Sequence, residues 1–125
     1  ECSIALTGGT VDRSSGNRYF LSGPLANQSI SMSGADVAVL GGSGLCIQRG
    51  LTDPGYNAAS VKRAMIDVSR KTIIVMDHTK LGQLHVATVC GLDMIDTLVT
   101  DVKAPAEYVE QLQDQGVRVI VAPYE

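Results

Sequence analysis

The sequence lacks the features that would place this chain in a membrane, on a nucleic acid or around a structural metal. No apolar run approaches the roughly 20 residues that cross a bilayer. The net charge is -3 and Lys and Arg do not cluster, so there is no electrostatic footprint for a phosphate backbone. Cys2, Cys46 and Cys90 form no C-x-x-C pair and have no metal-ligand spacing with a histidine. We therefore expect no membrane segment, no metal site, and poor DNA binding by this chain alone.

Several motifs of nucleotide and hydrolase chemistry are missing as well. No Gly-Lys-Ser/Thr closes a P-loop, and the stretch GGSGL at 41–45 has no third glycine to complete a dinucleotide fingerprint. No Gly-x-Ser-x-Gly nucleophile elbow is present. We therefore expect no cofactor, and covalent hydrolysis is disfavoured.

Length and composition favour one domain. The 125 residues, 45% of them apolar, are enough to build one hydrophobic core. An odd number of widely spaced cysteines favours reduced thiols and a cytoplasmic protein. The chain opens on Glu1 and passes into an apolar stretch without a signal-like segment, so we expect residues 1–125 to be one domain cut from a longer polypeptide.

Short apolar stretches alternate with helical patterns along the chain. Strands are expected at 4–6, 37–40, 73–76, 96–101 and 117–123, with weaker extended stretches at 17–23 and 83–89, where Leu84 and Val86 alternate. Helices are expected at 23–32, from Asn57 as N-cap to Val68, and at 104–116. This alternation predicts a Rossmann-like α/β fold, with a mostly parallel sheet and helices on both faces.

The helix that follows Asn57 has the clearest apolar stripe. The residues at helical spacing are Ala58, Val61, Ala64, Met65 and Val68. Lys62 lies one residue past this stripe, and periodicity alone favours a solvated lysine over a ligand-binding one.

Three glycine-bearing loops follow predicted strands and are candidates for contact with a ligand. They lie at 7–10, with Gly8, Gly9 and Thr10, at 41–45, with Gly41, Gly42 and Gly44, and at 49–52. Backbone N–H groups without side chains, together with a hydroxyl, suit a phosphate or a sugar oxygen. Glycine pairs also end strands for purely conformational reasons, so each loop alone leaves both interpretations open.

The stretch MDHTKLG at 76–82 places an acid, an imidazole and an ammonium directly after a buried strand. Open α/β sheets bind ligands at the C-terminal ends of their strands, so Asp77 and Lys80 point toward the crevice, where a lysine suits a phosphate. His78 is a hydrogen-bonding candidate, whereas His85 is expected to be structural or exposed. The stretch could form an active site, a binding site or a polar loop.

The order of these motifs resembles the effector-sensing domain of DeoR-family bacterial transcriptional repressors over nearly the whole chain. The stretches that carry the resemblance are LTGGT, LSGPLA, ADVAVLGGSGL, GLT, VKRAMI followed by DHTKLG, and IDTLVTD. Such domains share the α/β fold of ribose-5-phosphate isomerase and bind phosphorylated sugars or related metabolites at the strand ends. The resemblance implies the same fold and ligand class for this chain.

The resemblance also implies which residues would bind the effector. These are Gly8, Gly9, Thr10, Gly41, Gly42, Gly44, Lys62, Asp77 and Lys80. The family pattern has a lysine at the position of Lys62, which brings the two interpretations of this side chain to even weight.

Two departures from the pattern bear on the chemistry. The isomerases keep a glutamate directly before the helix lysine as the proton-abstracting base, whereas this chain has Val61, which cannot accept a proton. The site should therefore bind without turnover, so an enzyme is not expected. The repressor pattern also usually has an acid four residues before the lysine, where this chain has Ala58.

A full repressor of this family would begin with a winged helix-turn-helix and with the first strand and helix of the sensor domain, and neither precedes Glu1. We therefore expect a sensor domain truncated at its N-terminus, which reaches operator DNA only through the absent module and forms a homo-oligomer. The leading hypothesis is a sugar-phosphate sensor that controls DNA binding. The alternatives are a small sugar-phosphate isomerase with Asp77 or Asp101 as base, and an assembly domain whose loops bind nothing.

Overall fold

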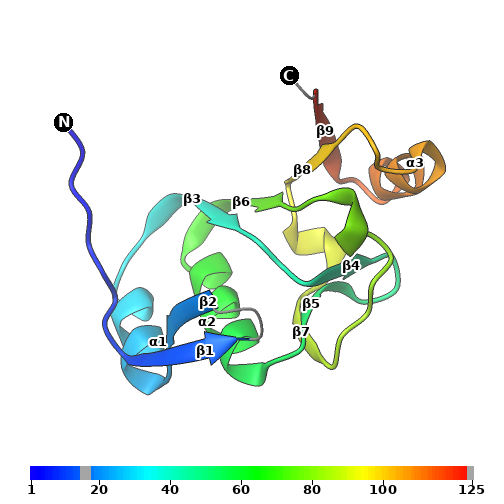
Figure 1. The fold of residues 1–125 in the computed structure, drawn as a ribbon. Helices are drawn as coiled ribbons and strands as arrows, with labels where there is room; N and C mark the ends of the chain where they lie inside the picture. The colour runs from blue at the N-terminus through cyan, green and yellow to red at the C-terminus, as the bar shows by residue number, and fades with distance from the viewer. Residues whose placement is uncertain (15–17, 124–125) are drawn as a thin grey trace.

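A four-stranded parallel sheet organises the chain (Figure 1), which a computed structural model describes at residues 1–14 and 18–123. The strand order is β3 (Ala35–Leu40), β6 (Ser69–Val75), β8 (Thr97–Asp101) and β9 (Arg118–Ala122). Each of these strands pairs in parallel with its neighbour. The expectation of an α/β fold with a mostly parallel sheet is confirmed.

The two helices that pack on this sheet lie on the same face. Helix α2 (Tyr56–Asp67) connects β3 to β6, and α3 (Ala106–Asp114) connects β8 to β9. Each crossover adds its strand in the same direction, and right-handed crossovers in one direction place their helices on one face. The buried residues of α2 and α3 accordingly join one hydrophobic cluster with the sheet.

The two faces of the sheet differ sharply in exposure. Leu40, Ile74 and Leu98 are 0 to 5% exposed and belong to the hydrophobic cluster that contains the buried residues of α2 and α3. On the opposite face Val37 is 43% exposed and Val39 61%. Parallel strands are usually covered on both faces, so the described residues cover only one face of their own sheet.

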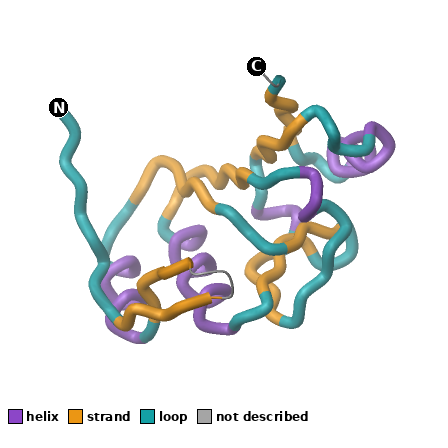
Figure 2. The backbone as a smooth tube through the Cα atoms, viewed as in Figure 1, coloured by secondary structure: helices purple, strands orange, loops and turns teal. Residues whose placement is uncertain are grey.

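Two small antiparallel units flank the parallel sheet (Figure 2) and were not expected from the sequence. One is the hairpin of β1 (Thr10–Ser14) and β2 (Arg18–Ser22). The other contains β4 (Gly44–Cys46), β5 (Gly50–Asp53) and β7 (Ala87–Cys90). Within the 17–23 stretch, Arg18–Ser22 form one strand of the hairpin and Gly23 is the N-cap of the following helix, while Asn17 lies outside the described residues.

Two strand predictions were wrong. Residues 4–6 form no strand, and Ile4 and Leu6 are 87% and 82% exposed because no neighbouring strand pairs with them in the described chain. The strand expected at 83–89 begins only at Ala87, and Leu84 and Val86 are exposed. Alternating apolar residues make a strand only where a partner supplies the backbone hydrogen bonds.

The helices agree better with expectation. Helix α1 (Pro24–Ser31) starts at its proline, and α3 ends just before Gly116. Helix α2 begins earlier than predicted, with Gly55 in place of Asn57 as its N-cap. Its fully buried residues are Ala59 and Ile66, whereas the predicted stripe is only partly buried.

Two short 3₁₀ helices, η1 (His78–Lys80) and η2 (Leu92–Met94), complete the fold. No helix among the described residues is long and apolar enough to span a membrane.

The asymmetry between the two sheet faces predicts matched effects of two truncations. Ile74→Ala should lower the free energy of unfolding by about 2 to 5 kcal/mol, because it leaves a cavity in a closed core. Val39→Ala, one strand away on the open face, should cost less than about 0.5 kcal/mol. Urea unfolding followed by circular dichroism measures both, and equal losses would contradict the assignment of the buried face.

Candidate functional site

A cavity of about 1000 Å³ opens at the C-terminal end of β3. One wall consists of the loop that follows β3, and a second wall consists of the first turns of α2. The β1–β2 hairpin supplies a third wall. The cavity thus lies where open α/β sheets bind their ligands.

Gly41, Gly42 and Ser43 form the wall that follows β3. A side chain at Gly42 would overlap Leu51 and come within 3.2 Å of Met76. Gly44 is buried and does not line the cavity, and a side chain there would overlap the backbone of Gln83. Close packing therefore explains why positions 42 and 44 are glycine. Of the glycines predicted to bind the ligand in this loop, Gly41 and Gly42 line the cavity.

Lys62 lies in the cavity and pairs with a buried acid, Asp53. The Nζ atom of Lys62 donates to Oδ2 of Asp53 at 2.6 Å, and the backbone N–H of Ser43 donates to Oδ1 at 3.0 Å. The Asp53 side chain is 3% exposed and the Lys62 side chain 23%. Lys62 is therefore held at the cavity with part of its side chain open to solvent.

Helix α2 presents Lys62 because position 62 shares a face with Ala59 and Ile66, the two buried residues of the helix. The periodicity argument for a solvated lysine was wrong, because it chose the neighbouring stripe as the packed face. Asp53 was missed by sequence reasoning. Its only signal was an acid directly after the glycine-bearing stretch at 49–52.

The hairpin wall contributes charged residues that sequence reasoning also missed. Asp12, Arg13 and Arg18 line the cavity. Asp12 accepts hydrogen bonds from the hydroxyl of Ser22 and from Nδ2 of Asn57, the latter at 3.2 Å. These contacts tie the hairpin to the first turn of α2, so the two walls are joined across the cavity.

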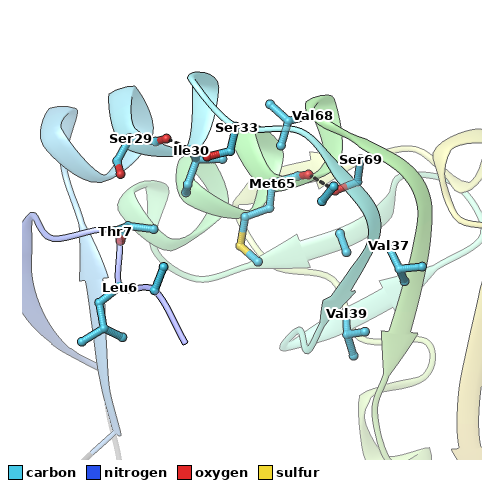
Figure 3. A pocket seen from close by; sticks show the side chains of 13 residues that line it. Leu6, Thr7, Ser29, Ile30, Ser33, Val37, Val39, Met65, Val68 and Ser69 are labelled. Atoms are coloured by element: carbon cyan, nitrogen blue, oxygen red, sulfur yellow. Dashed lines mark hydrogen bonds between the residues drawn. The ribbon is translucent and has the colours of Figure 1, made fainter. Parts of the chain in front are cut away.

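A second, smaller cavity of about 260 Å³ lies beside the first (Figure 3). Leu6 and Thr7 lie on one side of it and Val37 and Val39 of β3 on the other. Its lining is mostly apolar, which suits it poorly to a phosphorylated ligand.

The predicted residues Gly8, Gly9 and Thr10 are not among those that line either cavity, although the preceding residue Thr7 lines both. Gly8 and Gly9 have positive φ angles of 72° and 104°, which favour glycine. A side chain at Gly9 would press against the backbone of Ser22. In the structure Gly8 and Gly9 therefore form the turn by which the chain enters β1.

Asp77 and Lys80 follow β6 at the same sheet edge, but neither lines the large cavity. Asp77 caps η1 by accepting hydrogen bonds from the hydroxyl of Thr79 and from its N–H, the latter at 2.8 Å. These two hydrogen bonds are the main reason that the pKa of Asp77 is lowered; desolvation opposes them, and the charges of Lys80 and His78 lower the pKa further. The loop at 77–80 therefore lies next to the cavity and is held in shape by its own hydrogen bonds.

His78 is fixed to Asp101 at the end of the next strand, β8. Its Nδ1 lies 2.9 Å from Oδ1 of Asp101, and its backbone N–H donates to Oδ2 at 2.7 Å. Desolvation raises the pKa of Asp101, but hydrogen bonds from the N–H groups of His78 and Lys103 and from the His78 ring outweigh it and lower the pKa to about 2. His78 is thereby assigned to holding η1 against β8.

Asp77, His78 and Asp101 bring potential ligand atoms within 4.8 Å of one another. These side chains already bond to Thr79 and to each other, so we assign no metal to the group.

His85, expected to be structural or exposed, is half-buried, and its Nε2 lies 3.2 Å from the carbonyl oxygen of Ser43. Burial raises the pKa of the Cys90 thiol to about 11, so this group is protonated at neutral pH.

Parallel strands that end at a cavity lined by a lysine define a small α/β domain of the ligand-binding type. Residues 1–102 match the sequence model of the DeoR C terminal sensor domain, and the chain belongs to that family. It is a sensor domain of the DeoR type, as the motifs of the sequence indicated. Helix α3 and strand β9 follow the matched region.

Three relatives illustrate the match. The HTH-type transcriptional regulator GolR of Listeria innocua is 32% identical over 96% of this chain and 46% of its own length. The regulator GlpR of Haloferax volcanii is also 32% identical, over 94% of this chain and 45% of its own. The glycerol-3-phosphate regulon repressor of Escherichia coli K12 is 28% identical over 93% and 45%. The chain spans about half the length of the curated relatives that it matches.

The low pKa of Asp101 predicts a specific acid dependence. Its folded-state pKa lies below its ordinary value of 3.8, so the carboxylate stabilises the fold above about pH 4, and this contribution is lost as the pH falls toward 2. Asp101→Asn should be less stable than the parent at pH 5 and should lose part of the decline in stability between pH 5 and 2.5.

Urea unfolding across this pH range measures the effect. The control is Asp36→Asn, which removes a carboxylate with an 89% exposed side chain from the start of β3 and should leave the slope unchanged. An Asp101→Asn variant with the full parental acid dependence would contradict the assigned hydrogen bonds.

Proposed function

We propose that this domain belongs to an intact transcriptional repressor whose affinity for operator DNA changes when a phosphorylated sugar or related metabolite binds in the large cavity. The observation that carries the proposal is the Lys62 ammonium, held by Asp53 in a cavity of about 1000 Å³ at the strand ends. Family membership and the printed names of the relatives support a regulatory role. One of these names refers to a phosphorylated polyol, glycerol-3-phosphate.

The wall formed by α2 supports binding of an anion. Gly55 is the N-cap of this 12-residue helix and provides no side-chain hydrogen bond to the first turn. Pro54, Gly55 and Tyr56 line the cavity. The first N–H groups of a helix and its dipole favour negative charge, so a phosphate would find complementary groups at the start of α2.

Binding without turnover fits the same residues. Val61, at the position of the isomerase base, has an apolar side chain that lines the cavity and cannot accept a proton. Asp77 and Asp101, the other candidate bases, do not line the cavity. The relatives are transcriptional regulators and lend no support to an isomerase, and we infer a domain that is not an enzyme.

The rest of the effector site is proposed on the family resemblance. Gly41 lies beside the end of β6, since a side chain at this position would come within 3.7 Å of the Val75 carbonyl oxygen. A ligand that extends past Gly41 would therefore reach Asp77 and Lys80 in the loop after β6. Gly8, Gly9, Thr10 and Gly44 stay predicted contacts or supports. We also infer that the remaining half of the longer protein carries the DNA-binding module, and that the repressor is a cytoplasmic homo-oligomer.

The proposed function is tested with the intact repressor bound to its operator. A panel of phosphorylated sugars and polyols is titrated while fluorescence anisotropy follows DNA release. One member of the panel should change the DNA affinity by about 5- to 150-fold, the usual range of an allosteric coupling. If every compound leaves a fully active DNA complex unchanged, the proposal fails.

Two lysine variants locate the site on the effector that the panel identifies. Lys62→Met should weaken effector binding by at least about tenfold, because a charged hydrogen bond contributes roughly 1.5 to 3 kcal/mol. Lys80→Met tests the β6 loop in the same way and should have the smaller effect, because Lys80 does not line the cavity. Calorimetric titration of each variant measures both affinities, and the reverse order would place the ligand on the β6 loop.

A further inference from the structure

Among residues 1–14 and 18–123, Asp53 is the one acid that lies at the cavity and is almost fully buried. It is 2% exposed at the end of β5, and each of its oxygens has a different partner. Oδ1 accepts from the N–H of Ser43, and Oδ2 accepts from the ammonium of Lys62. A buried carboxylate is tolerated only when it is paired and hydrogen-bonded. Asp53 therefore occupies one N–H donor of Lys62 before any ligand binds.

The ammonium keeps donors for a ligand. A lysine has three N–H donors, and Asp53 takes one of them, while the side chain remains 23% exposed at the cavity wall. A ligand oxygen bound to Nζ at about 2.8 Å would lie within roughly 5.5 Å of Oδ2 of Asp53. At these two distances, about 2.8 Å and 5.5 Å, the carboxylate repels an anion about half as strongly as the ammonium attracts it.

We propose that Asp53 is a positioning and specificity-determining residue, which holds Lys62 against the Gly41–Ser43 loop and offsets its charge, so that Lys62 bonds a neutral oxygen of the ligand. This inference rests on the proposed function, in which the effector is a phosphorylated sugar. Lys62 then contacts a hydroxyl or carbonyl oxygen of the sugar. The phosphate binds elsewhere in the cavity, beyond the reach of the Asp53 carboxylate.

The chain offers a position at which the role of the charge can be separated from the structural role of Asp53. Ala58 lies one helical turn before Lys62 and lines the same cavity. A glutamate at this position would be at i−4 to the lysine, a spacing and order at which the two side chains pair. It would restore a carboxylate beside the ammonium without restoring the hydrogen bond to Ser43.

The test uses inorganic phosphate as the probe and calorimetric titration at low ionic strength. Asp53→Asn keeps the size of the side chain and removes its charge, and it should bind phosphate about tenfold more tightly than the parent. This gain should disappear in Asp53→Asn/Lys62→Met, and the carboxylate added in Asp53→Asn/Ala58→Glu should reverse most of it. Asp67→Asn is the matched control, because it removes a 54% exposed carboxylate from the same helix, and its phosphate affinity should stay within twofold of the parent.

Circular dichroism and thermal melting establish that each variant is folded. If Asp53→Asn does not fold, Ala58→Glu alone carries the test, because a second carboxylate beside Lys62 should weaken phosphate binding several-fold. A folded Asp53→Asn that binds phosphate no more tightly than the parent overturns the inference. So does a gain in affinity that survives Lys62→Met, or an Ala58→Glu that leaves phosphate affinity unchanged where Asp53→Asn cannot be used.

The phosphate titration and the operator experiment can fail separately. If no compound of the panel changes operator binding, the proposed function is refuted. The phosphate affinity of Asp53→Asn would still report on the charge at Lys62. An active effector combined with an unresponsive Asp53→Asn would remove only the role assigned to Asp53.

Discussion

The carboxylate of Asp53 is the interaction on which the candidate site depends. It connects three parts of the chain that are separate in the sequence: the end of β5, the loop after β3 through the Ser43 N–H, and helix α2 through Lys62. Because the carboxylate is buried, each partner also compensates for the cost of removing the other from water. The position of the ammonium, the shape of the glycine loop and the charge of the cavity floor therefore follow from one side chain.

The order in which the strands join the parallel sheet explains the rest of the architecture. Strands β3, β6, β8 and β9 are added in one direction, so the helices that connect them, α2 and α3, share a face. That face holds the core, and the carboxyl end of β3 opens into the cavity. The opposite face and the free edge of β3 present valines to solvent, which marks them as surfaces that a longer polypeptide can cover.

Sequence reasoning succeeded where local patterns determine structure. The parallel strands around Val39, Ile74 and Leu98 and the helix that starts at Pro24 follow from apolar runs and helix-start signals that act over a few residues. The strand expected at 4–6 failed because a strand needs a partner, and no pattern within three residues reveals whether one exists. Lys62 was underrated because its face of α2 is defined by Ala59 and Ile66, and Ala59 is too small to stand out in a hydrophobic pattern. Asp53 was missed because a buried acid is recognised only through partners that the fold brings to it.

The central claim is that an effector binds in the cavity beside Lys62. The most direct measurement is a nitrogen–proton correlation spectrum of the labelled domain during titration with the effector that releases the operator. The account predicts the largest shifts at the amides of Gly41, Gly42, Asn57 and Lys62, with small changes on the open face around Val37. Shifts that are concentrated around Val37, or that spread evenly over the chain, would contradict it.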